Sequence, residues 1–229
     1  MMPKTKDKAL SDIRSTREIE RRRMNREAIL HAAEAMIIRK GLNAASMDDV
    51  AAEAGFSKAT LYKYVRGKSE LVFELLIHFM EDLDAGIKPI VEGPLKPEAK
   101  LLALLRTILR FQVEKENISR TFLLDPFSFR MLHVMTGDKE HPATQAERDF
   151  LRRLYSAREA VLGRVEAFLR EGIKTGAFRP ISLDSGIRFL SAVIQGYQHD
   201  NFSLKTKPDL EKDVSDIYAF LLRGLASGN

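Results

Sequence analysis

Residues 46–68 read SMDDVAAEAGFSKATLYKYVRGK and predict two short helices joined by a tight turn. Ser46 is placed to cap the first helix, and Asp49 three residues later completes a capping box in front of an apolar run. Gly55 supplies the backbone freedom that ends this helix, and Ser57 is placed to cap the next one. Two helices joined in this way form a helix-turn-helix.

The second helix, expected over 58–65, has an inner and an outer face. Leu61 and Val65 recur at a four-residue spacing and point inward. The remaining side chains that look outward are Lys58, Thr60, Tyr62, Lys63 and Tyr64. Hydrogen-bond donors and aromatic rings on the outer face of such a helix suit a DNA major groove.

This motif resembles the DNA-binding domain of the TetR family of bacterial transcriptional regulators. The residues that carry the resemblance are Met47-Asp48-Asp49-Val50-Ala51, Gly55, Leu61-Tyr62, Lys68 and Glu70-Leu71. One departure is Val65, where members of the family often carry Phe. Both side chains are apolar, so the core contact should be kept. Beyond about residue 90 the resemblance is limited to length and helical pattern.

The resemblance implies a role in DNA binding for each outward residue. Lys58, Thr60 and Lys63 are expected to read base edges, because Lys meets guanine acceptors and the Thr methyl meets a thymine methyl. Phosphate contacts are expected from four further residues, Ser46, Tyr62, Tyr64 and Lys68. The alternative is that all of them are ordinary surface residues of a small helical domain.

Charge is concentrated in the part of the chain that holds this motif. Residues 1–70 carry 15 Lys/Arg and 10 Asp/Glu, whereas the rest of the 229-residue chain carries 22 of each. The whole net charge of +5 therefore lies there. Residues 1–20 are expected to form a basic flexible arm or a frayed helix, which either follows the DNA backbone or only aids solubility.

Several classes of protein are excluded by what the sequence lacks. The chain has no cysteine, so disulfides and thiolate metal sites are absent. The histidines fall into no metal-ligand spacing, and there is no phosphate-binding glycine loop, nucleophile elbow or dinucleotide fingerprint. We therefore expect neither an enzyme nor a cofactor or metal. No apolar run could span a bilayer and the N-terminus is charged, which predicts a cytoplasmic protein with no membrane partner.

The whole chain reads as all-α, and its expected parts follow in order. The basic arm (1–20) precedes a helix-turn-helix domain (21–67), a connecting helix (68–85) and a C-terminal ligand-binding and dimerisation domain (86–229). Gly86, Pro89, Gly93, Pro94 and Pro97 predict a linker after the connecting helix. Further helices are expected over 98–116, 119–135, 143–175, 183–198 and 210–225.

Aromatic and methionine side chains predict an apolar ligand pocket in the C-terminal domain. Candidate wall residues are Phe111, Phe122, Phe127, Tyr155 and Phe189. Arg130, His133 and Gln195 are candidate polar groups in or near the same pocket. The alternative is that the apolar stripes form plain core and that His133 is a structural residue.

The last two expected helices carry more apolar surface than one subunit needs. The candidate dimer residues are Leu190, Ile194, Ile217 and Leu221. In the resembled family the corresponding helices meet their symmetry mates in a four-helix bundle, and the alternative is that they complete the monomer core.

Together these expectations describe a homodimeric repressor that binds a double-stranded operator with inverted half-sites. A small apolar or aromatic effector, which the sequence does not identify, would release it from DNA. The alternative is a ligand-independent regulator or architectural protein whose C-terminal domain only dimerises.

Overall fold

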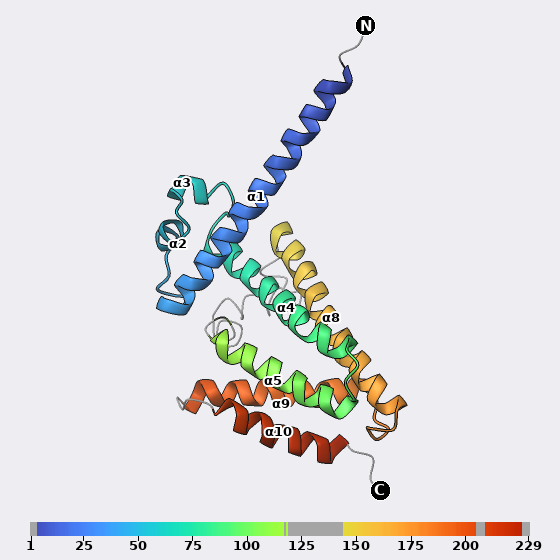
Figure 1. Ribbon diagram of the computed structural model, residues 1–229. Coiled ribbons are helices and arrows are strands. Elements are labelled where there is room, and N and C mark those ends of the chain that lie inside the picture. The colour runs from blue at the N-terminus through green and yellow to red at the C-terminus, as the bar shows by residue number, and fades with distance from the viewer. Residues whose placement is uncertain (1–3, 117, 119–143, 205–208, 226–229) are drawn as a thin grey trace. The chain divides into compact units, whose positions relative to one another are not determined.

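The computed structural model describes residues 4–116, 118, 144–204 and 209–225, which form helices and no β-strand (Figure 1). The prediction of an all-α chain is confirmed. The chain divides into two compact units, residues 1–75 and residues 76–229. The helix expected over 119–135 lies outside the described residues.

The first unit consists of α1 (Lys4–Lys40), α2 (Met47–Glu53), α3 (Lys58–Leu61) and the start of α4 (Lys68–Glu92). Its core is formed by apolar side chains from all four helices: Ile29, Ala33, Met36, Val50, Leu61, Val65, Leu71 and Leu75. Because residues of α1 and α4 contribute to this core, the helix-turn-helix is held on a rigid support.

The capping residues that the sequence predicts around α2 and α3 are confirmed. The backbone N–H of Asp49 donates to the Ser46 hydroxyl at 3.1 Å, and its carboxylate accepts from the Ser46 backbone N–H at 3.0 Å. Ser57 caps α3 by accepting from the Thr60 N–H at 3.1 Å. Gly55 has a φ of +71°, which is favourable for glycine because other side chains are strained there.

The α3 helix is shorter than the expected span of 58–65. It ends at Leu61, and the backbone N–H groups of Lys63 and Tyr64 then bond to carbonyls only three residues earlier. This tighter turn brings Val65 into the core, where it is 1% exposed.

The α1 helix begins at Lys4, so residues from Lys4 onward take the helical form of the two that were expected for residues 1–20. Its N-terminal part extends beyond α2 and α3 within the first unit (Figure 1). Pairs one turn apart, Arg21 with Glu18 at 2.6 Å and Arg23 with Glu27 at 3.1 Å, support the exposed turns.

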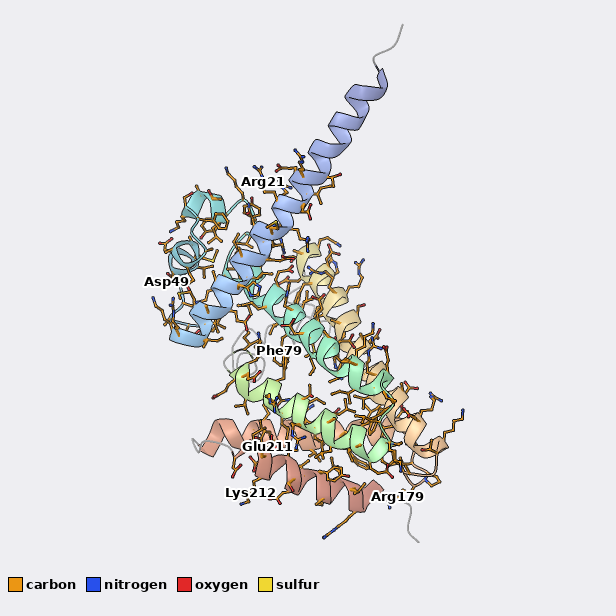
Figure 2. The ribbon with its side chains drawn as sticks, viewed as in Figure 1. Arg21, Asp49, Phe79, Arg179, Glu211 and Lys212 are labelled. Carbon is orange, nitrogen blue, oxygen red and sulfur yellow. The ribbon has the colours of Figure 1, made fainter. Side chains whose placement is uncertain are left out.

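The second unit contains the rest of α4 with α5 (Pro97–Glu114), α8 (Gln145–Lys174), α9 (Leu183–Leu204) and α10 (Leu210–Leu225). The α5 helix packs against both α8 and α10, and α8 packs against α9. Arg106 on α5 also donates to Glu211 on α10 at 3.0 Å, and Figure 2 labels Glu211 there. The α5 helix buries seven of its 18 residues, among them Leu101, Leu105 and Leu109.

The linker predicted from Gly86 onward is wrong in its first half, because α4 continues to Glu92 with Pro89 inside the helix. Pro89 has no N–H to donate, so the helix continues through it with one backbone hydrogen bond missing. Ile87 and Val91, on either side of it, are 0% and 8% exposed. We attribute the continued helix to their burial in the core.

No helix among the described residues is long and apolar enough to cross a lipid bilayer.

Candidate nucleic-acid interface and ligand cavity

The surface around α3 displays part of the predicted DNA-contacting set. Tyr62 is 46% exposed, and Lys58 and Lys63 are also exposed. Lys58 pairs with Asp48 of α2 at 2.8 Å, and this carboxylate raises the pKa of Lys58. Lys58 must therefore leave Asp48 before it can reach a base, whereas Lys63 forms no such ion pair within the described part of the chain.

Other predicted DNA contacts already have internal hydrogen bonds. The Ser46 hydroxyl is used in the cap of α2, and the Thr60 hydroxyl lies 2.9 Å from that of Ser57. The Lys68 ammonium donates to the Asn43 carbonyl at 3.2 Å. An ammonium group has three protons to donate, so Lys68 keeps capacity for a phosphate.

Tyr64 is half-buried and connects elements of the first unit. Its hydroxyl accepts from Nδ2 of Asn25 on α1 at 2.7 Å, and its ring stacks on Phe56 with centroids 6.3 Å apart. Its carbonyl accepts from Arg26, which also pairs with Glu74 at 2.7 Å. Phosphate contact by Tyr64 stays a prediction, but its hydroxyl has a structural partner that the sequence does not indicate.

A cavity of about 430 Å³ lies in the second unit between α4, α5, α8 and α9. This volume falls in the range of small-molecule sites. Most of its wall is apolar and is formed by Phe79, Met80, Leu83, Leu101, Leu104, Leu105, Ile108, Val161, Leu162, Val165, Phe168, Leu190 and Ile194. The polar members of the wall are Gln112, Arg158, Ser191, Gln195 and Gln198.

Only some of the predicted pocket residues take part in this cavity. Gln195 lines it, and Phe111 contacts the wall residue Phe79, which Figure 2 labels, with ring centroids 4.8 Å apart. Tyr155 and Phe189 are 38% and 58% exposed and do not line it. The other four predicted residues, Phe122, Phe127, Arg130 and His133, lie outside the described residues.

Charged side chains hold the helices that form the cavity wall. Arg164 on α8 pairs with Asp84 at 2.9 Å and with Glu92 at 2.6 Å, both on α4. These pairs, chiefly the hydrogen bond to Asp84, raise the pKa of Arg164. Lys100 on α5 is 3% exposed and donates to Glu171 on α8 at 2.7 Å. The cavity therefore lies between helices that are fixed to one another.

The predicted dimer residues differ in how much surface they offer. Leu190 and Leu221 are 8% and 7% exposed, because both pack in the core of their own unit. Their neighbours Phe189 and Phe220 are 58% and 71% exposed. An interface on α9 and α10 would therefore rest on these two rings more than on the two leucines.

Gln112 is one of the cavity residues that the sequence analysis did not predict, although its place on α5 could have indicated it. On α5, Leu101, Leu105 and Ile108 follow one face, and Gln112 continues the same face four residues later. One polar residue in an apolar stripe is informative, because burying an amide without a partner is unfavourable.

Comparison with known proteins agrees with the fold and with the motif. Residues 29–75 match the family model for bacterial regulatory proteins of the tetR family. The nucleoid occlusion factor SlmA of Idiomarina loihiensis is 30% identical over 161 residues, covering 70% of this chain and 71% of that protein. The HTH-type transcriptional repressor KstR2 of Rhodococcus jostii is 26% identical over 166 residues, covering 72% and 74%.

A solved structure shares the fold over most of both chains. The transcriptional regulator FadR of Bacillus subtilis, in complex with stearoyl-CoA, superposes with a TM-score of 0.64 at 16% identity, covering 86% of this chain and 98% of FadR. The resemblance drawn from the helix-turn-helix is thus confirmed. The chain belongs to the TetR family of bacterial regulatory proteins and is a DNA-binding transcriptional regulator, not an enzyme.

Proposed function

We propose that this protein is a dimeric repressor that binds an inverted-repeat operator and leaves it when a small apolar ligand enters the cavity of the second unit. The observation that carries the proposal is the combination of an exposed reading surface, with Tyr62 46% exposed, and a cavity of about 430 Å³ in the other unit. The bacterial chromosome lies in the cytoplasm, so the protein would act there.

Repression is supported by the similarity to KstR2, a transcriptional repressor that matches 72% of this chain. A ligand is supported by the cavity itself and by FadR, which shares the fold and was solved with stearoyl-CoA. The ligand-independent alternative predicts a filled core around residues 122–135, a segment outside the described residues. The cavity between α4, α5, α8 and α9 favours a ligand.

The α4 helix offers a route by which the ligand could affect DNA binding. Its first turns supply Leu71 and Leu75 to the core of the first unit, and its later turns supply Phe79 and Leu83 to the cavity wall. A ligand that favours one position of this helix changes operator affinity, and by linkage the operator changes ligand affinity equally. A coupling of about 1–3 kcal/mol corresponds to roughly 5- to 150-fold.

The first test is a selection of duplexes from a random library at physiological salt, followed by titration of the selected duplex complex with small apolar compounds, 1-decanol and decanoate among them. We expect a motif with inverted half-sites, and we expect added ligand to dissociate the complex in fluorescence polarisation. If a motif is selected but ligands that bind the cavity do not release the protein from the duplex, the ligand-independent alternative is favoured.

Dimerisation is tested with Phe220→Glu, because a charge on a ring that is 71% exposed should prevent an apolar interface without disturbing the subunit core. We expect a monomer in sedimentation and weak operator binding. Tyr155→Glu is the matched control, since Tyr155 is exposed on α8 instead. A persistent Phe220→Glu dimer would place the interface elsewhere.

A further inference from the structure

The cavity of the second unit differs in polarity between its buried wall and its mouth. Among the described residues, every buried member of the wall is apolar; these are Phe79, Leu101, Leu104, Leu105, Ile108, Phe168 and Leu190. The exposed members are polar, Arg158 on α8 and Gln195 on α9. A residue that lines a cavity and is also exposed lies where the cavity meets solvent. Arg158 and Gln195 therefore mark the mouth.

The α9 helix contributes neutral polar groups to the wall. Ser191, Gln195 and Gln198 follow one another at spacings of four and three residues, so they share one face of the helix. Hydroxyl and amide groups can both donate and accept hydrogen bonds. This side of the cavity accommodates polar substituents of a ligand but does not select the sign of a charge.

Arg158 is the only charged residue on the wall within the described part of the chain, because no Asp or Glu lines the cavity there. The neighbours of Arg158 one helical turn away carry no carboxylate; they are Leu154, Tyr155, Val161 and Leu162. The Arg158 guanidinium also forms no ion pair with any other described residue. The described wall therefore has a net positive charge that no side chain neutralises.

Other arginines of α8 already have carboxylate partners. Arg152 pairs with Asp149 at 3.0 Å, and Arg164 pairs with Asp84 at 2.9 Å. Arg158 instead keeps its N–H donors for a ligand, and the planar guanidinium matches the two oxygens of a carboxylate. An apolar cavity with such a group at its mouth suits an organic anion.

We propose that the cavity takes an amphiphilic carboxylate, whose apolar chain or ring system lies against the buried wall and whose carboxylate accepts hydrogen bonds from Arg158 at the mouth. The carboxylate keeps part of its water there, so the ligand avoids the cost of burying an unpaired charge. This assignment rests on the proposed ligand site and adds to it the class of effector and the residue that selects the class.

The test compares decanoate with 1-decanol, which have the same chain length and different head groups. An apolar cavity without a cation favours the alcohol, because a carboxylate costs more to dehydrate than a hydroxyl. By isothermal titration calorimetry at low ionic strength, where charges are screened least, we expect the full-length protein to bind decanoate about tenfold more tightly than 1-decanol, the size of one charge-assisted hydrogen bond. Arg158→Gln should reverse this order, because it removes the charge and keeps a polar side chain.

Arg152→Gln is the matched control, since it removes the same charge from α8 at an exposed position that does not line the cavity. It should keep the preference for decanoate. Equal or tighter binding of 1-decanol by the natural protein, a preference for decanoate that survives Arg158→Gln, an equal loss of preference in Arg152→Gln, or no binding of decanoate would each overturn the assignment.

Operator release separates this assignment from the proposed function. If 1-decanol releases the operator and decanoate binds no more tightly than 1-decanol, ligand-controlled repression holds and the role of Arg158 falls. If decanoate binds through Arg158 but leaves the operator complex intact, the role of Arg158 holds and ligand-controlled release by this class falls.

Discussion

Between α1, α2 and α4 the first unit leaves a space of about 10 Å³, whereas the second unit holds a half-open cavity of about 430 Å³ between α4, α5, α8 and α9. The first space is at the limit of what one water molecule fills, and the second could admit a small molecule. A unit that reads DNA must hold its side chains in fixed positions, while a unit that senses a ligand must keep space for it. The difference in packing therefore fits our proposal that the first unit binds DNA and the second unit binds a ligand.

The largest effect expected from this difference comes from truncating one leucine in each unit. Leu61 is 0% exposed in the densely packed first unit, and Leu105 is 2% exposed but borders the cavity. Leu61→Ala should lower the free energy of unfolding by about 3–5 kcal/mol, and Leu105→Ala by about 2–3 kcal/mol, because Leu105 has fewer contacts to lose. Guanidinium unfolding measures both.

An equal or larger loss for Leu105→Ala would mean that the cavity is closed in solution and that the second unit is as densely packed as the first. Operator binding by the same two variants is an independent measurement. Leu61→Ala should abolish it, since this side chain fixes α3, and Leu105→Ala should leave it measurable.

A second prediction concerns two glycines of α8, one packed tightly and one not. A Cβ at Gly172 would lie 2.0 Å from the Phe178 ring, whereas a Cβ at Gly163 would meet nothing within 4 Å. Gly172→Ala should therefore destabilise by about 1–3 kcal/mol through overpacking. Gly163→Ala should stabilise by about 0.5–1 kcal/mol through helix propensity. The thermal unfolding midpoint should fall for Gly172→Ala and rise for Gly163→Ala. A midpoint for Gly172→Ala that does not fall would contradict the close packing of α8 on Phe178.

The same contrast explains how much could be predicted from the sequence. In the first unit the decisive interactions are local: the Ser46–Asp49 box, the turn at Gly55 and the cap at Ser57 each join residues a few positions apart. Residue types and spacing are enough to predict them. The internal partner of Tyr64 is Asn25, 39 residues away, and no local pattern indicates such a contact.

In the second unit the decisive interactions are distant in sequence. Helical periodicity predicts which side chains of α5 and α9 face inward, but it does not separate those that meet another side chain from those that border a cavity. The pair Lys100–Glu171 spans 71 residues, and only the folded chain brings Gln112 and Arg158 to the wall of one cavity. The continuation of α4 through Pro89 likewise depends on the burial of its neighbours in the core.

A third, smaller effect is expected from Tyr64→Phe, which tests whether this residue serves the fold or the DNA. Removing the hydroxyl leaves Nδ2 of Asn25 without its partner at 2.7 Å and should cost about 1 kcal/mol of stability. If the role is internal, the salt dependence of operator binding should keep its slope, because no phosphate contact is lost. A slope reduced by about one would show that Tyr64 leaves Asn25 to hold a phosphate. Lys68→Ala provides the comparison, since its ammonium is expected to contact phosphate.

The smallest effect concerns Asp49, whose carboxylate joins the cap of α2 to α1. The hydrogen bond from Lys40, followed by those from Ser46, holds the pKa of Asp49 well below its ordinary value. A depressed pKa in the folded state means that the ionised carboxylate stabilises the fold above its ordinary pKa, and that this contribution is lost as the pH falls below about 4. The gap in the free energy of unfolding between the natural protein and Asp49→Asn should therefore be widest near neutral pH and should narrow in acid.

Denaturant midpoints of both proteins between about pH 7 and about pH 3 measure this gap. Asp48→Asn removes the same charge one residue earlier, outside the capping box but within the pair with Lys58, and serves as the comparison. If the two gaps narrow together, the effect belongs to the charge pairs of α2 in general. If only the Asp49 gap narrows, the box itself titrates, and the placement of α2 depends on this local interaction.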